Sequence, residues 1–277
     1  MAVAASSNQP QMDAGTFTRL CQLVDQACGI TLNEDKATLV TNRLFKRLRE
    51  LNLNNYSDYL TYLKADKTGE EMTTLLDSIS TNVTYFFREP EHFMFLQQTF
   101  DRWIAEGKKK FRVWCAAAST GEEPYTFMMS LEDRLKSGID LKMMATDIST
   151  RALSKAIRGE YQEKALKDIP PDLRRRFMQP AAEPGMFSVV DGMKKRITYR
   201  RLNLVEMPLP FKDGGLDLVL CRNTMIYFQQ PLRQKLVNEF ERLLRPGGFL
   251  VVSHSESLVG VKTELHTVKP SIYQKDE

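Results

Sequence analysis

Residues 111–125 read FRVWCAAASTGEEPY and decide the fold. An apolar run is followed by small residues and then by a helix start, the order expected of a strand, a tight turn and a crossover helix. Thr120 can cap that helix, and Pro124 suits its first turn. The sequence therefore predicts a strand-turn-helix unit whose small-residue turn lets a ligand lie against the backbone.

The charge of this helix start indicates the kind of ligand. Glu122 and Glu123 would repel a pyrophosphate, which needs bare N–H groups or a lysine. Residues 143–149, MMATDIS, predict a second strand that ends in Asp147, where doubly wound folds bind a nucleoside ribose. S-adenosylmethionine fits both features, because it is a nucleoside without phosphate whose sulfonium and amino groups are cationic. In the alternative interpretation, the glutamates only favour the helix N-terminus and Asp147 only caps a helix.

Composition is that of an ordinary soluble protein, with 277 residues, 42% hydrophobic and 27% charged. There is neither a signal-peptide pattern at the start nor an apolar run of roughly 20 residues, so we expect a cytoplasmic protein without membrane insertion. The net charge of +4 is too weak to imply nucleic acid. Because the four cysteines form no C-x-x-C pair and His92, His254 and His266 are scattered along the sequence, we expect no disulfide and no metal site.

The first part of the chain predicts a helical domain over residues 13–80, after a frayed start at 1–12. The first helix is expected to run from Asp13 to Cys28, with Gly29 as its stop, and the second at about 34–51, with Asn33 as its cap. A third helix is expected to start at Ser57, and a fourth at 69–80. In the second of these, the side chains of Lys36, Arg43 and Arg47 share one face beside an apolar stripe. This basic ridge is either a solvated face or a docking surface for an acidic protein partner.

From about Phe111 short apolar runs alternate with helical stretches, which predicts a parallel sheet with crossover helices in a catalytic domain over residues 94–277. Strands are expected at 111–116, 141–146, 197–202, 216–221 and 248–253, helices at 122–136, 149–158 and 231–244, and a final edge strand within 266–274. Arg245-Pro246-Gly247-Gly248 predicts a helix stop and turn, and the extended runs around Asp191-Gly192 predict a β-hairpin at 186–199.

Polar residues follow several of these strands, where open sheets bind ligands. Asn203-Leu204 follows one strand and the segment from Cys221 to Phe228 follows another. The linker at 81–93 mixes amide, hydroxyl, aromatic and cationic side chains and predicts a lid over the site. The alternatives are polar turns at the strand ends and a linker that buries its aromatic residues.

Four segments, 81–88, 116–125, 145–149 and 221–228, together resemble the chemotaxis receptor methyltransferases, the CheR family, in order and spacing over nearly the whole chain. The resemblance implies an S-adenosylmethionine-dependent protein-glutamate O-methyltransferase that yields S-adenosylhomocysteine and acts on cytoplasmic helices of chemotaxis receptors. We expect a monomer. It also implies an α/β, Rossmann-like doubly wound catalytic domain, a helical N-terminal domain that approaches the receptor through the basic ridge, and an inserted antiparallel β-subdomain. Some members grip a receptor's C-terminal pentapeptide with that subdomain, but the region 179–200, with few glycines and a basic Lys194-Lys195-Arg196, departs from the tethering pattern.

Carried over by motif, the family's cofactor contacts imply Arg88 at the methionine carboxylate, Glu123 at the amino end and Asp147 at the ribose. The full implied set is Asn82, Thr84, Arg88, Glu123, Asp147, Asn203, Leu204, Arg222 and Asn223. A glutamate acceptor, with a pKa of about 4.3, is ionised at neutral pH and needs no general base. Positioning is then the main task, for which Arg88, Arg222 and Tyr227 are the catalytic candidates, the last two for the acceptor. The rival hypotheses are a nucleic-acid methyltransferase and a non-catalytic scaffold that binds the cofactor.

Overall fold

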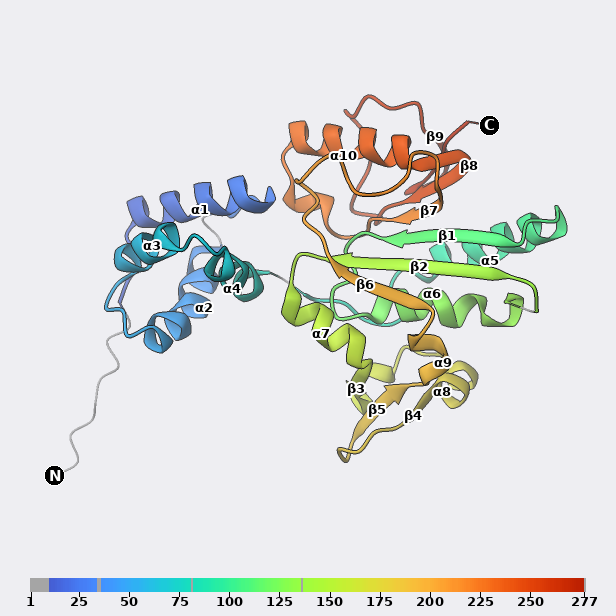
Figure 1. The fold of residues 1–277 in the computed structure, drawn as a ribbon, viewed down its shortest axis with the longest axis horizontal. Helices are drawn as coiled ribbons and strands as arrows, with labels where there is room; N and C mark the ends of the chain where they lie inside the picture. The colour runs from blue at the N-terminus through green and yellow to red at the C-terminus, as the bar shows by residue number, and fades with distance from the viewer. Residues whose placement is uncertain (1–9, 34–35, 81, 136, 277) are drawn as a thin grey trace. The chain divides into compact units, whose positions relative to one another are not determined.

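The computed structural model describes residues 10–33, 36–80, 82–135 and 137–276 (Figure 1). The chain forms two compact units, Met1–Thr81 and Asn82–Glu277. The first contains four helices within its described residues: α1 (Ala14–Cys28), α2 (Ala37–Glu50), α3 (Tyr56–Ala65) and α4 (Glu70–Ile79). Their apolar faces bury Leu20, Leu44 and Leu75 completely. This unit is the all-helical domain that the sequence predicts.

The helix ends follow local capping chemistry with one correction. Asp13 accepts the Thr16 N–H of α1, and Gly29 ends that helix in the left-handed region with φ 71°, both as expected. The third helix starts at Tyr56 rather than at Ser57, because the Asn55 side chain accepts the Asp58 N–H at 2.9 Å and serves as cap. The start predicted for the second helix lies partly outside the described residues, since 34 and 35 are not among them.

The second unit is built on a seven-stranded sheet with the order β6-β2-β1-β7-β8-β10-β9. The strands are β1 (Lys110–Cys115), β2 (Asp140–Asp147), β6 (Ile197–Arg201), β7 (Leu216–Leu220), β8 (Leu244–Val251), β9 (His266–Lys269) and β10 (Ile272–Gln274). The first five in spatial order run parallel, and β10 is antiparallel to both of its neighbours. The predicted final edge strand is therefore a pair of strands.

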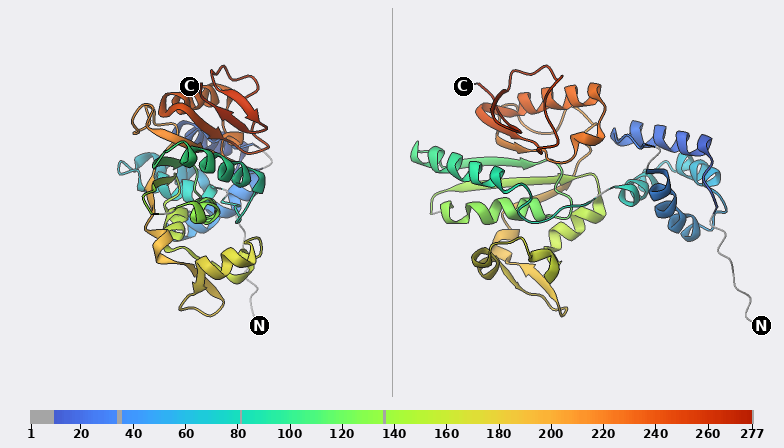
Figure 2. Two further views of the ribbon diagram at one scale, coloured as in Figure 1. Left: turned by 90° about the vertical axis from the view of Figure 1, so that its right-hand side faces the viewer. Right: turned by 180° about the vertical axis from the view of Figure 1, so that it is seen from behind.

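Helices cover both faces of this sheet (Figure 2). Side chains of α5 (Pro90–Ala105), α6 (Glu122–Leu131) and α7 (Thr150–Arg158) share a core with Phe111, Val113 and Cys115. Side chains of α10 (Gln230–Leu243) share the other core with Trp114. The alternation along β1 follows from the period of two in a strand. Pro90 starts a long helix in the stretch that the sequence treats as a linker, and the helix expected at 122–136 ends as α-helix at Leu131.

A small antiparallel sheet of order β3-β5-β4 is inserted between α7 and β6 (Figure 1). Its strands are β3 (Glu160–Gln162), β4 (Met178–Pro180) and β5 (Met186–Val189), accompanied by α8 (Pro171–Phe177) and α9 (Asp191–Lys194). The hairpin predicted around Asp191-Gly192 is wrong. That dipeptide lies in the helical turn α9, the strand before it pairs with β3 and β4, and the strand after it runs parallel to β2.

The predicted helix stop is confirmed, since α10 ends at Leu243, but the turn predicted at Arg245-Pro246-Gly247-Gly248 is wrong. Strand β8 runs through all four residues, with a shift in its register against β7. Gly247 has φ 71°, and a Cβ on Gly248 would lie 2.9 Å from the Arg245 carbonyl oxygen and 3.2 Å from that of Asp217. The glycines thus allow a bulge inside a strand rather than a turn between elements.

Candidate active site

The polar strand ends predicted from the sequence meet at one edge of the large sheet. Asp147 ends β2, the turn 116–121 follows β1, and Arg222 follows β7, and these three parallel strands are neighbours. Backbone bonds fix the turn between the other two ends, since Ala116 N–H donates to the Leu220 carbonyl and Ala118 N–H to that of Thr146, both at 2.8 Å. This is the edge at which open α/β sheets bind ligands.

Asp147 holds the turn after β1. Its carboxylate accepts the N–H of Ser119 at 2.8 Å and that of Ser149 at 2.9 Å. Ser119 has φ 49°, a left-handed conformation, and its buried hydroxyl has no hydrogen-bond partner in the described part of the chain. The cap of α7 is Ser149, whereas Asp147 fixes the turns that precede α6 and α7, and the unsatisfied Ser119 hydroxyl beside it is suited to a polar ligand.

The small sheet supports the same turn. Gly121 has φ 98°, and a Cβ there would lie 2.8 Å from Tyr161 Oη and 2.9 Å from Ala156 Cα. Tyr161, in β3, donates its hydroxyl to the Thr120 carbonyl at 2.8 Å, and its ring packs edge-on against that of Phe86, with the ring centroids 5.0 Å apart. One buried tyrosine thus connects the inserted sheet, the turn and the segment before α5.

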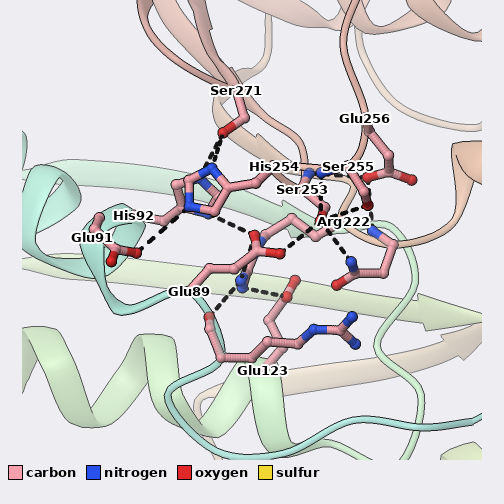
Figure 3. Close-up of polar contacts among 12 residues, drawn as sticks. Glu89, Glu91, His92, Glu123, Arg222, Ser253, His254, Ser255, Glu256 and Ser271 are labelled. Carbon is pink, nitrogen blue, oxygen red and sulfur yellow. Dashed lines mark hydrogen bonds and ion pairs between the residues drawn. The ribbon is translucent and has the colours of Figure 1, made fainter.

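Arg222 lies at the centre of a buried polar cluster (Figure 3). Its side chain is 1% exposed; Nη1 is 2.6 Å from Glu123 and Nη2 is 3.2 Å from Glu89, and Nη2 also donates to the Arg88 carbonyl. Both terminal nitrogens are thus engaged inside the protein, whereas the buried Nε has no hydrogen-bond partner among the described residues. These contacts show that Arg222 fixes Glu89 and Glu123, and its role in orienting an incoming carboxylate stays a prediction.

Glu123 lies in the first turn of α6, where the sequence places it. One of its oxygens accepts from Arg222, and the other accepts the Cys115 thiol at 3.3 Å. Burial raises the pKa of the Glu123 carboxyl, and the positive charge of Arg222 opposes that shift. Burial also raises the pKa of the Cys115 thiol well above its usual range, so this thiol is protonated and not a nucleophile at neutral pH.

Two of the three histidines come together, although the sequence separates them widely. The His92 and His254 rings are 4.6 Å apart, and the Ser271 hydroxyl lies 2.9 Å from the first and 3.0 Å from the second (Figure 3). With Glu89 they offer ligand atoms within 4.8 Å of one another, so the expectation that the histidines are too scattered for a metal site is wrong for this pair. A cation there would compete with Arg222 for Glu89, and we interpret the group as a hydrogen-bond network.

The remaining predicted cofactor residues line the neighbouring segments. Arg88 donates to the Val83 carbonyl at 3.1 Å and lies over the Tyr85 ring at 5.6 Å, which orders the segment before α5. The Asn223 amide donates to Ser253 Oγ at 2.6 Å, and Asn203 donates to Glu206 at 3.1 Å. Of the others, Leu204 is buried, and Asn82, Thr84 and Tyr227 are half-buried.

The basic ridge belongs to the helical unit and is engaged in internal contacts. Arg43 donates to the carbonyls of Ile79 and Ser80, at 2.9 and 3.1 Å, at the end of α4. Arg47 forms a two-point ion pair with Glu71, at 2.5 and 3.1 Å, and Glu71 is 4% exposed and also accepts the Tyr59 hydroxyl at 2.9 Å. Arg43 and Arg47 of the ridge therefore stabilise the helical domain.

Sequence reasoning missed several residues of the site. Tyr161, Ser253 and Glu256 were not singled out, and Glu89 appeared only at the end of a linker. Ser253 and Glu256 belong to the polar run Ser-His-Ser-Glu directly after β8. Polar residues that follow a strand mark the ligand-binding edge of an open sheet, and this rule, which identifies Asn223 after β7, applies equally to the run after β8.

Comparison with known proteins now identifies the family. Residues 15–80 match the CheR methyltransferase all-alpha domain, and residues 82–273 match the CheR methyltransferase SAM binding domain. The chain belongs to the CheR methyltransferase family. A chemotaxis protein methyltransferase of Borreliella burgdorferi is 33% identical over 94% of both chains. That of Escherichia coli K12 is 38% identical over 87% of this chain and 84% of its own.

The cofactor of this CheR domain is S-adenosylmethionine, and the edge of the sheet has chemistry that suits it. Asp147 and Glu123 supply acceptors for hydroxyl and amino groups, and the Ser119 hydroxyl is unsatisfied. No helix within the described residues is long and apolar enough to cross a bilayer. The predictions of fold, family and cofactor are confirmed, whereas the roles of individual residues stay predictions.

Proposed function

We propose that this CheR-family chain transfers the methyl group of S-adenosylmethionine to glutamate side chains of chemotaxis receptors, giving methyl esters and S-adenosylhomocysteine. The observation that carries the proposal is the convergence of Asp147, Glu123 and Arg222 at the ends of three adjacent parallel strands in the family's cofactor-binding domain. The relatives quoted above are named for chemotaxis. We further propose that the chain acts in the cytoplasm on the receptors' helices.

Within this proposal each polar group holds one part of the cofactor. Asp147 accepts from the ribose, Glu123 from the amino group, and Arg88 pairs with the methionine carboxylate. The residues that complete the site are Asn82, Thr84, Asn203, Leu204, Arg222 and Asn223. The bound cofactor supplies a methyl group on a cationic sulfur. The segment 81–93 then contributes to the cofactor site, and residues 94–277 form the catalytic domain around it.

The chemistry asks for positioning rather than for proton transfer. A glutamate acceptor with a pKa of about 4.3 is more than about 99% ionised at pH 7, so no general base is required. Tyr227, half-buried in the 3-10 turn Met225–Tyr227, is our candidate for orienting the acceptor carboxylate. Alignment of this kind can supply roughly 7–11 kcal/mol of the barrier.

The positive face of α2 is proposed to approach the receptor. Lys36, Arg43 and Arg47 define the ridge, and the exposed side chains of Lys46 and Arg49 extend it. Because the guanidinium groups of Arg43 and Arg47 also make internal contacts, the exposed pair offers the cleaner test of docking.

The test is the chemistry of the product. The purified chain is incubated with methyl-tritiated S-adenosylmethionine and a receptor cytoplasmic fragment, and the labelled fragment is treated with alkali. We expect label that alkali releases as methanol, and none on a matched fragment whose acceptor glutamates are replaced by alanine. Alkali-stable label would contradict a carboxylate acceptor. Label on RNA or DNA would favour the nucleic-acid hypothesis, and no label on any substrate would favour a scaffold.

A further inference from the structure

Glu256 lies buried beneath the loop that follows β7. It is 3% exposed, and its two oxygens accept four backbone N–H groups. One oxygen takes those of Asn223 at 2.7 Å and Ser253 at 2.9 Å. The other takes those of Thr224 at 2.6 Å and Ile226 at 3.2 Å. Three of the four donors belong to the loop that carries Arg222, Asn223 and Tyr227.

The backbone of that loop forms an anion-binding concavity. Asn223 has φ 58°, and a left-handed residue within a turn directs neighbouring N–H groups toward one point. Such a concavity commonly receives an anion from outside, but here the chain supplies its own carboxylate from the segment after β8. The four N–H donors satisfy a buried charge that would otherwise be costly, and the carboxylate in turn fixes the loop's unusual conformation.

The same segment reaches the rest of the site through Ser253 (Figure 3). The Ser253 hydroxyl donates to Glu89 at 2.6 Å and accepts the Asn223 amide at 2.6 Å. Glu89 is the carboxylate that contacts Arg222. Residues 253–256 therefore connect the segment before α5 with the loop after β7.

We propose that Glu256 is a positioning residue for methyl transfer. It fixes the loop 222–227, and so sets where Asn223 meets the cofactor and where Tyr227 meets the acceptor. The role in turnover rests on the function proposed above, whereas the role in cofactor binding can be measured without any receptor.

The test compares Glu256→Gln with Glu264→Gln, a matched change at an exposed glutamate. Glutamine keeps the shape of the side chain but presents an NH₂ group to two N–H donors. We expect hydrogen exchange at the amides of Asn223, Thr224 and Ile226 to accelerate while amides of β1 stay protected. The dissociation constant of S-adenosylhomocysteine should rise about tenfold or more, as expected when hydrogen bonds to a charged group are lost. Glu264→Gln should change neither quantity.

A control variant that is destabilised as much as Glu256→Gln separates an effect on positioning from an effect of general destabilisation. Leu141→Ala opens a cavity at the start of β2, at the opposite end of that strand from Asp147, and should lower the melting temperature without changing cofactor affinity. If Glu256→Gln binds S-adenosylhomocysteine as tightly as the wild type, or no more weakly than Leu141→Ala at equal loss of melting temperature, the proposal is wrong.

If Glu256→Gln does not fold, Glu256→Asp replaces it, because the shorter side chain keeps the charge but cannot reach all four N–H donors. A folded Glu256→Asp with wild-type affinity would overturn the proposal, and weakened binding would support it. If the wild type methylates no receptor fragment while Glu256→Gln still loses affinity, the proposed substrate fails and the positioning role stands.

Discussion

Asp147 illustrates how one side chain serves structure and chemistry together. Its carboxylate accepts the Ser119 and Ser149 N–H groups and so fixes the turn after β1, and the same carboxylate is the proposed acceptor for the ribose. The sequence could place Asp147 at a strand end. It could not show that the same oxygens hold a left-handed serine, because that contact depends on the conformation of a turn from another strand.

Asp147→Asn should weaken the binding of S-adenosylhomocysteine by about 1–3 kcal/mol, because an amide offers one acceptor oxygen in place of two and carries no charge. Titration calorimetry measures the change. Asp140→Asn, at the opposite end of the same strand, is the control and should leave the affinity unaltered. NAD should bind neither variant nor wild type, because Glu122 and Glu123 occupy the place of a pyrophosphate. An unaltered affinity in Asp147→Asn would leave this residue with the role of fixing the turn after β1 alone.

His92 should make stability depend on pH. Burial, reinforced by the charge of Arg222, lowers its pKa to about 4, whereas an unfolded histidine titrates near 6.5. The unfolded chain therefore binds a proton that the folded chain does not, so stability is complete above about pH 6.5 and falls as the pH drops toward 4. Between pH 6.5 and 5 the loss should be about 1.5 kcal/mol. Urea unfolding at both values measures it.

The control for this effect is the exposed His266. His92→Gln should remove most of the loss of folding stability between pH 6.5 and 5, whereas His266→Gln should show the same loss as the wild type. Glu89 and Glu91, whose pKa values are lowered, contribute mainly at lower pH. An undiminished loss in His92→Gln would assign the titration to another group.

At the scale of elements, periodicity and strand ends predicted the parallel sheet and most of its helices. The failures are places where distant partners prevail over a local signal. Asp191-Gly192 has the composition of a hairpin turn, but the strands on either side find partners in different sheets. Gly247-Gly248 has the composition of a helix stop, but in β8 it permits a bulge. Turn chemistry constrains the backbone locally and does not name the partner of a strand.

The ion pair between α2 and α4 should matter for stability more than its position on the surface suggests. Arg47→Ala removes the cation that pairs with Glu71, whose side chain is 3% exposed. The Glu71 carboxylate then keeps only the hydrogen bond from the Tyr59 hydroxyl. Since Arg47 is 24% exposed and its charge is partly screened, we expect a loss of about 1–3 kcal/mol from the helical unit. Lys46→Ala, whose side chain is 85% exposed, should change stability by less than about 0.5 kcal/mol.

Hydrogen exchange of α2 and α4 amides in the full chain measures this local loss. Equal protection in Arg47→Ala and wild type would contradict it. Receptor docking is therefore better tested by the double variant Lys46→Glu and Arg49→Glu. It should lower the rate of receptor methylation without unfolding the helical domain. The difference from the wild type should be smaller at high salt, because salt screens exposed charges.

At the scale of the whole molecule, the site is assembled from segments that are far apart in the chain. Glu89, Glu123, Arg222 and Ser253 meet through the order of the sheet, which no single motif encodes. Strand ends identified many of the segments. Their mutual contacts, including the pairing of His92 with His254, follow from topology and could not be taken from spacing.

Methyl transfer as a whole should be nearly independent of pH from about 6.5 to 8.5, because a glutamate acceptor is ionised throughout that range and needs no base. Initial rates with a receptor fragment at saturating cofactor measure it. Tyr227→Phe should lower the rate across the entire range while cofactor affinity stays close to that of the wild type. A rate that falls steeply near pH 6.5, and ceases to do so when His254 is replaced, would instead reveal a general base.

The place of the small sheet within the chain has an evolutionary consequence. The chain leaves the large sheet after α7 and re-enters it at β6, directly beside β2, so the length of the inserted part does not affect the register of the parallel strands. Tyr161, near the start of the insertion, donates to the turn after β1, and Leu166, Ile169, Phe177 and Val189 are buried in the same core as β1. Lineages can therefore remodel the exposed residues of the insertion, and inherit a new partner preference, while these buried anchors keep it attached to the large sheet.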